Sequence, residues 1–279
     1  MYNIEKFSLF SSTKIIEEYN QRKASNTKNR IHRNQTYIFG KAALILNHML
    51  SKFIIFLALF FEFKQRIIKS GLSSINLKAN GIGDVKVLSD YFIDNLPKEV
   101  WINDIRHNEI NNTYNLKNSE NNITLIWQDE IKTLNNMFSG CYNITEIDLS
   151  NFNTSQVTNM HSMFFGCSSL ISMDLSNFDT SQVRDMNCMF FGCTNLTSLN
   201  LSNFDTSHVN FMHSMFRGCS SLISLDLSNF DTSQVSNMYS IFRGCTSLIS
   251  LDISNFNISN ILFGDSMFFN CPKLEFIIL

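Results

Sequence analysis

The sequence has 279 residues, of which 44% are hydrophobic and 16% charged, a composition that excludes a disordered chain and allows one or two folded domains. The net charge of −2 conceals an asymmetry: residues 1–52 hold nine Lys and Arg against three Asp and Glu (net +6), whereas residues 137–279 hold four against eleven (net −7). The acidic half argues against nucleic acid as the main partner, because contacts of basic residues with phosphates dominate that affinity.

The N-terminal segment, residues 1–69, contains the most apolar run of the chain, FIIFLALFFEF at residues 53–63. This run has eleven residues, whereas a helix needs about 20 to cross a bilayer. Met49 and Lys52 precede it, which gives the basic start of a secretion signal and would make Met49 the first residue, although no small-residue cleavage site follows. We predict a signal peptide or an anchor at residues 53–63, with membrane association through it, and keep a core helix as the alternative.

Residues 70–136 are predicted to form a small β-rich cap followed by a degenerate first repeat. Ile75–Leu77 and Val100–Ile102 have the composition of strands, and Gly81–Gly83 has that of a turn. The stretch 122–134 continues the spacing of the repeats that follow it.

Residues 137–279 repeat a unit of 26 residues. Five units begin at Met137, Met163, Met189, Met215 and Ile241, and a partial sixth begins at Met267. Six cysteines keep the same phase, namely Cys141, Cys167, Cys193, Cys219, Cys245 and Cys271. Such a unit buries its apolar side only by stacking on its neighbours, so a solenoid is predicted. The chain stops at Leu279, inside the strand of the sixth unit, and we expect this edge to be buried against something or to mark a fragment.

Each unit is predicted to consist of a strand and a short helix. The strand half has the spacing L-x-x-L-x-L-x-x-F of a leucine-rich repeat, with Phe in place of the usual Asn or Cys; its apolar residues are Leu170, Met173, Leu175 and Phe178. The other half has one apolar helical face; it is formed by Val183, Met186, Met189 and Phe190. Asp179 with Gln182 is predicted to cap this helix, and Gly192 to end it. The expected fold is an α/β repeat solenoid with a parallel concave β-sheet, short convex helices and the β-rich N-terminal cap.

The repeated motif M-F-x-G-C-x-S-L-x-S-L-D-L-S-N-F-D-T-S-x-V-x-N-M resembles the BspA-like leucine-rich-repeat surface proteins over residues 137–279. The resemblance implies a cell-surface or secreted protein that binds matrix proteins, other cells or host receptors, and it implies no enzyme activity. An intracellular, cytoplasmic scaffold built on the same repeat is the alternative.

The concave face is the predicted binding site for a protein or glycoconjugate, since side chains alternate along each strand and repeat proteins use that sheet as an extended surface. The residues expected to face outwards are Ser172, Asp174, Ser176, Ser198, Asn200, Ser202, Ser224, Asp226 and Ser228. They would form a flat, mildly acidic patch that suits a basic or hydroxyl-rich partner.

Stacked acidic residues and cysteines also raise the question of metal sites. Asp148, Asp174, Asp226 and Asp252 share one strand position, but no loop supplies the six to eight oxygens that calcium prefers, so a solvated face is favoured. The in-phase cysteines would point in parallel and include no C-x-x-C motif, which favours buried apolar side chains over disulfides or zinc. No metal and no cofactor are predicted.

Two further candidates for chemistry are a cysteine and a pair of histidines. Cys188 stands outside the cysteine phase and is expected to be exposed and free. His161 and His213 occupy equivalent positions two units apart, without a recurring nucleophile, so they are interpreted as exposed helix residues. No catalytic residue is predicted.

Overall fold

The computed structural model describes residues 48, 51–52 and 72–279. The chain divides into two units, Met1–Lys69 and Ser70–Leu279, and the second contains nearly all of the described residues. The predicted signal or anchor at residues 53–63 therefore lies outside the described part.

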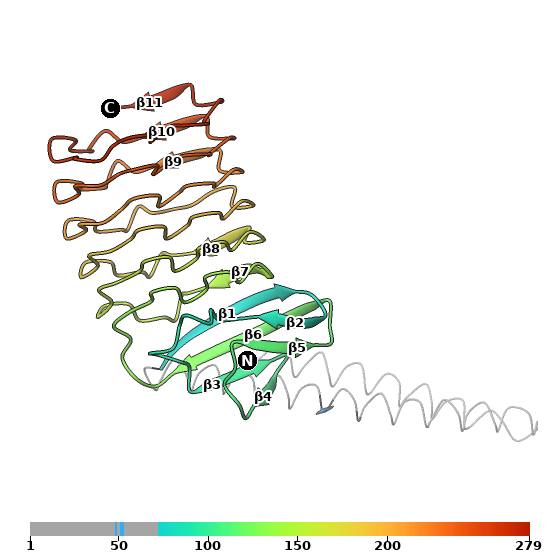
Figure 1. The fold of residues 1–279 in the computed structure, drawn as a ribbon. Coiled ribbons are helices and arrows are strands. Elements are labelled where there is room, and N and C mark those ends of the chain that lie inside the picture. Colours follow the sequence, from blue (N-terminus) through green and yellow to red (C-terminus); the bar gives the residue numbers. More distant parts are fainter. Residues whose placement is uncertain (1–47, 49–50, 53–71) are drawn as a thin grey trace, which may run out of the picture. The chain divides into compact units, whose positions relative to one another are not determined.

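The cap, residues 72–127, is built from six strands (Figure 1). They are β1 (Ser73–Asn80), β2 (Gly83–Lys86), β3 (Glu99–Ile102), β4 (Ile105–His107), β5 (Thr113–Leu116) and β6 (Glu120–Trp127). Both segments expected to form strands do so, Ile75–Leu77 within β1 and Val100–Ile102 as part of β3. In β1 the buried Ile75, Leu77 and Ala79 alternate with more exposed residues, because successive side chains of a strand point to opposite faces.

Strand β1 joins the cap to the repeats. The strand order is β4-β3-β6-β1-β7-β8, so β1 is bonded to β6 on one edge and to β7 (Ile144–Asp148) on the other, antiparallel to both. Leu77 accordingly faces Ile123 on one side and Ile147 on the other. The strand of the degenerate first repeat is therefore separated from the first complete unit by an inserted cap strand.

The second half of the degenerate repeat does stack on the next unit. Ile131 and Leu134 are buried, and Thr133 bridges Asn159, which lies 26 residues further on. The stretch 122–134 thus belongs to two parts of the fold, since its beginning lies in β6 and its end lies in the repeat stack.

The repeat stack, residues 137–279, places equivalent residues of successive units side by side (Figure 1). Its strands after β7 are β8 (Ser172–Asp174), β9 (Ser224–Asp226), β10 (Ser250–Asp252) and β11 (Phe276–Ile278). Strand β7 pairs in parallel with β8, and β9, β10 and β11 form a second parallel sheet. The sheet is not continuous as predicted, because the equivalent segment 198–200 is not a strand. All three residues of the terminal strand β11 are exposed.

The predicted convex helices are absent from residues 72–279, so the α/β assignment is wrong and the fold there is built from strands and turns. Cys188 and Gly192 have positive φ angles of 56° and 72°, and a right-handed helix cannot contain such residues. The backbone N–H groups instead bond to the next unit: Met186 N donates to Phe211 O at 2.9 Å, and Phe190 N to Met215 O at 2.9 Å. Gly192 is left-handed as expected, but it lies in a run of turns.

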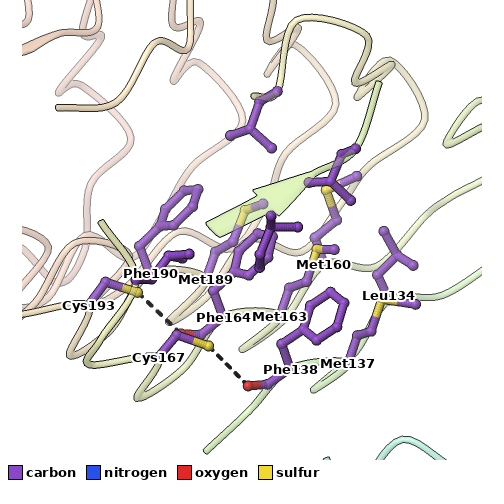
Figure 2. Packing of buried hydrophobic residues seen from close by; sticks show 14 of the residues in the cluster. Leu134, Met137, Phe138, Met160, Met163, Phe164, Cys167, Met189, Phe190 and Cys193 are labelled. Atoms are coloured by element: carbon purple, nitrogen blue, oxygen red, sulfur yellow. Dashed lines mark hydrogen bonds between the residues drawn. The ribbon is translucent and has the colours of Figure 1, made fainter. Parts of the chain in front are cut away.

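The core of the stack consists of ladders of identical side chains. The rings of Phe138, Phe164 and Phe190 lie nearly parallel, with centroids 5.9 and 5.6 Å apart (Figure 2). Stacked aromatic pairs contribute roughly 0.5–1.5 kcal/mol beyond the burial of their surface. The thiol of Cys167 donates to Phe138 O at 3.1 Å, and that of Cys193 to Phe164 O at 3.2 Å, as the dashed lines in Figure 2 show. The same alignment of successive units therefore stacks the phenylalanine rings and gives each of these thiols a carbonyl acceptor.

A second ladder is polar and buried. Thr180 Oγ1 donates to Asp205 O at 2.9 Å and accepts the Asp205 N–H at 2.8 Å, and Thr154 and Thr232 make equivalent pairs of bonds with the next unit. Thr206 Oγ1 donates to Asp231 O at 2.9 Å. These hydroxyls replace water for backbone groups that stacking buries. The predicted cap of Asp179 is a tighter turn, in which its Oδ1 accepts the Ser181 N–H at 3.0 Å.

Candidate interaction surface

The nine residues predicted for partner binding lie on one side of the stack, which we call the sheet face. In the unit of β8, Ser172, Asp174 and Ser176 are exposed, while Met173 is half-buried and Leu175 buried. The next unit repeats this pattern with exposed Ser198, Asn200 and Ser202, and the unit of β9 with exposed Ser224 and Asp226 and half-buried Ser228. The strand alternation therefore brings all nine to the same face.

The acidic side chains of this face also accept a backbone hydrogen bond at the end of their own strand segment. Asp174 Oδ1 accepts the Ser176 N–H at 2.9 Å, and Asp226 Oδ1 accepts the Ser228 N–H at 2.9 Å. Asn200 makes the equivalent bond to Ser202 N at 3.1 Å, which shows that an amide oxygen can replace the carboxylate. Each of these side chains has a structural role besides any contact with a partner.

Hydrogen bonding extends the ionised form of these carboxylates to lower pH. Bonds from the Ser176 hydroxyl and backbone N–H lower the pKa of Asp174 below its ordinary value, and those from Ser228 lower the pKa of Asp226 in the same way. The sheet face is therefore negatively charged at neutral pH, although Asn200 interrupts the row of charges.

A row of isoleucines directly before the strand segments was not predicted from the sequence. Ile171, Ile223 and Ile249, each directly before the first Ser of the strand segment, are 52%, 51% and 39% exposed. The row is interrupted by Thr145 and Thr197. The signal was present in the sequence, because Ile recurs at intervals of 26 or 52 residues outside the buried pattern. These side chains add apolar area to a surface that was expected to be wholly polar.

The cysteines form part of the core, as the sequence predicted. Cys141, Cys167, Cys193, Cys219 and Cys245 are buried and unbridged, while Cys271 in the last unit is half-buried. Burial raises the pKa of the Cys245 thiol to about 12 and that of Cys193 well above its ordinary value. The prediction for Cys188 is only half right: it is free but half-buried, and burial raises its pKa too.

The histidines lie outside the strand segments of their units. His161 and His213 are half-buried rather than exposed, and they lie in turns. His161 Nδ1 is 3.8 Å from Asp185 Oδ1, and burial lowers the pKa of His213.

Neither a metal site nor a membrane-spanning helix is found among the described residues. Across 48, 51–52 and 72–279, no group of three or more His, Cys, Asp or Glu side chains is placed to hold a metal ion. Within the same residues, no helix has the length and apolar character needed to cross a membrane.

A family model described as "Mycoplasma protein of unknown function, DUF285" matches the chain twice, at residues 108–199 and 191–276. Together the two matches span more than half of the chain, from the end of the cap to the last unit. No match was found among curated proteins or among solved structures.

Proposed function

The chain belongs to this DUF285 family, and from that premise we propose that it is a non-enzymatic, cell-surface or secreted repeat protein that binds a protein or glycoconjugate partner through its sheet face. The observation that carries the proposal is the regular repetition of exposed side chains there. At alternate positions of three successive strand segments stand Ser, then Asp (Asn200 in the middle unit), then Ser, and an exposed isoleucine precedes the first and third of these segments. A partner that lies along the stack would meet the same contacts again at every unit, so weak contacts would add up.

The chemistry of the face defines the partner. Serine hydroxyls donate and accept hydrogen bonds, and the ionised Asp174 and Asp226 attract positive charge. Ile171 and Ile223 provide an apolar edge that excludes water from neighbouring polar contacts. A partner with basic or hydroxyl-rich groups and some apolar surface would fit this combination.

The repeats themselves supply substitutions that test the face without disturbing the fold. Ile171→Thr with Ile223→Thr introduces the residue found at 145 and 197, and Asp174→Asn with Asp226→Asn introduces the residue found at 200. The purified full chain and both variants would be bound to immobilised matrix proteins and to host cells. The isoleucine pair should weaken binding roughly tenfold through lost apolar contact, and the aspartate pair should flatten the dependence of binding on salt.

The control exchanges Gln182 and Gln234 for Thr, at exposed turn positions away from the sheet face. If this pair weakened binding as much as the isoleucine pair, or if neither sheet-face pair had an effect, the sheet face would not be the binding site.

Location is tested separately. A C-terminally tagged chain is expected to be digested by protease added to intact cells, or to be found in the medium. Full protection of the tag until the cells are lysed would instead support an intracellular scaffold on the same stack.

A further inference from the structure

A column of five side chains in the turn half of the units lies outside the core. We call it the aromatic–arginine column, and it consists of Phe165, Phe191, Arg217, Arg243 and Phe269, one residue from each of five consecutive units. Each follows the Phe of the core ladder in its unit, which is buried except for the half-buried Phe268, and precedes the left-handed Gly, or Asn in the last unit.

The backbone fixes the spacing of the column. Gly192 N donates to Arg217 O at 2.8 Å, and Gly218 N donates to Arg243 O at 2.8 Å, with equivalent bonds to the three phenylalanines. These glycines pack against each other, since a Cβ added to Gly192 would lie 3.6 Å from the Cα of Gly166. The backbone positions from which the column projects are therefore fixed from unit to unit.

The side chains of the column stack on each other while remaining accessible. The rings of Phe165 and Phe191 are 4.6 Å apart, Arg217 Cζ lies 5.1 Å from the Phe191 ring, and Arg243 Cζ lies 4.6 Å from the Phe269 ring. Phe165 is 36% and Phe269 59% exposed, and the other three are half-buried. The first unit carries Ser139 at this position, so the fold does not require an aromatic residue here.

The arginines bring a binding capacity that the structure leaves unused. A guanidinium stacked on a ring keeps its N–H edge available for two parallel hydrogen bonds to a carboxylate. Within residues 72–279, neither Arg217 nor Arg243 lies within ion-pair distance of a carboxylate. These two account for half of the basic residues in an otherwise acidic stack, so they form a local positive site between apolar rings.

We propose that the aromatic–arginine column binds an extended acidic peptide segment of another protein, in which carboxylates stand beside apolar side chains. The carboxylates would bond to Arg217 and Arg243, and the apolar side chains would cover Phe165 and Phe191. A polyanion such as nucleic acid fits less well, because its further phosphates would meet the net charge of −7 of residues 137–279. The column shares no residue with the sheet face, so this proposal can be tested independently of the function proposed above.

The test is selection from a library of random short peptides displayed on phage, with the full chain as bait. The native chain should enrich Asp or Glu next to Phe, Leu or Ile. A synthetic peptide of the enriched sequence should bind at least about tenfold more weakly to Arg217→Glu/Arg243→Glu. A version of this peptide with Asn and Gln in place of Asp and Glu should bind the native chain with a similar loss of affinity.

Matched variants distinguish binding at the column from a general effect of net charge. Arg184→Glu/Lys273→Glu makes the same change in net charge at exposed positions outside the column and should leave binding within twofold. Phe165→Ser/Phe191→Ser introduces the residue found at 139 and should fold, as thermal melting would show, yet lose binding.

Two results would overturn the proposal. One is an enriched sequence without carboxylates, or one that binds equally to the Arg217→Glu/Arg243→Glu chain. The other is binding of single-stranded DNA or phosphatidylserine vesicles that depends on Arg217 and Arg243 while acidic peptides do not bind.

Discussion

In the cap, neighbouring strands run antiparallel and differ in sequence, whereas in the repeat stack most segments face a near-copy of themselves from the next unit. Leu77 of the cap contacts different partners on its two sides, Ile123 and Ile147. Phe190 of the stack faces Phe164 on one side and Phe216 on the other. In the stack, the same residue type therefore recurs at equivalent positions of successive units. A residue type suits a buried position there only if its side chain can pack against an identical side chain.

This requirement determines which residue types occupy the buried and the exposed positions of each unit. Aromatic rings stack on their copies, and thiols and threonine hydroxyls donate to the backbone of the adjacent unit. Carboxylates at equivalent positions of successive units repel each other. The row containing Asp174 and Asp226 accordingly lies on the solvated sheet face. The cap has no such constraint, because each of its positions has its own neighbours.

High pH should break the stack before the cap, and this is the largest effect we expect. In the unfolded chain a thiol loses its proton near its ordinary pKa of 9.0, whereas buried thiols such as Cys193 and Cys245 keep theirs. Above that pH the folded state binds more protons, so the free energy of unfolding falls by about 1.4 kcal/mol per pH unit for each buried thiol.

Two probes distinguish the regions. All seven cysteines lie in the stack, and Trp101 lies in the cap, which has no cysteine. Trp127 is replaced by Phe for this measurement, because its ring packs on Phe152 of the stack with centroids 5.2 Å apart. As the pH is raised, thiol alkylation should accelerate at a lower pH than the one at which tryptophan fluorescence changes. Simultaneous change of both signals would mean that the cap and the stack unfold as one cooperative unit.

Truncating a ladder in its middle should cost more than truncating it at its end. Phe190→Ala removes a buried ring with neighbours on both sides and should cost about 3–5 kcal/mol. Phe268→Ala removes a half-buried ring that stacks on Phe242, and should cost less than half as much. Urea denaturation of the two variants gives the comparison, and equal costs would contradict the nearest-neighbour description of the stack.

The polar ladder should matter more than its hydroxyls would on a surface. Thr180→Val keeps the shape but leaves the part-buried N–H and C=O of Asp205 without their partner, at a cost of about 1–3 kcal/mol. Thr158→Val, at an exposed position of the preceding unit, is the control and should change the free energy of unfolding by no more than about 0.5 kcal/mol. A Thr180→Val chain as stable as the control would show that water satisfies these groups.

The smallest effect concerns the left-handed turn of each unit. Gly192→Ala places a Cβ on a backbone with a φ of 72°, at a cost of about 1–2 kcal/mol. Gly192→Asn should cost less, because Asn270 occupies the equivalent position with a φ of 61°. The thermal unfolding midpoints should therefore fall in the order native, Asn, Ala, and the reverse order for the two variants would mean that space rather than φ sets the cost.

Much of the sheet face could be predicted because strand geometry is local. A period of two residues places Ser172 and Asp174 on the side opposite Met173, whatever surrounds the strand. The repeat length fixed which residues become neighbours, so the phase of the cysteines and the parallel offset of 26 residues were readable as well. The exposure of the isoleucine row does not follow from the sequence pattern, because apolar residues at the start of a strand are ordinarily expected in the core. The aromatic–arginine column could not be recognised as one surface while its residues were assigned to helices.

The sequence by itself determined the repeat, the core positions and the side of the strand that meets solvent, since these follow from spacing and hydrophobicity alone. The conformation of the second half of each unit was decided by the tertiary structure. Val183, Met186, Met189 and Phe190 have the spacing of a helix, but a row of buried positions with that spacing also suits a chain of turns. Stacking settles the choice, because a neighbouring unit offers carbonyls to Met186 N and Phe190 N that an isolated segment would have to supply itself.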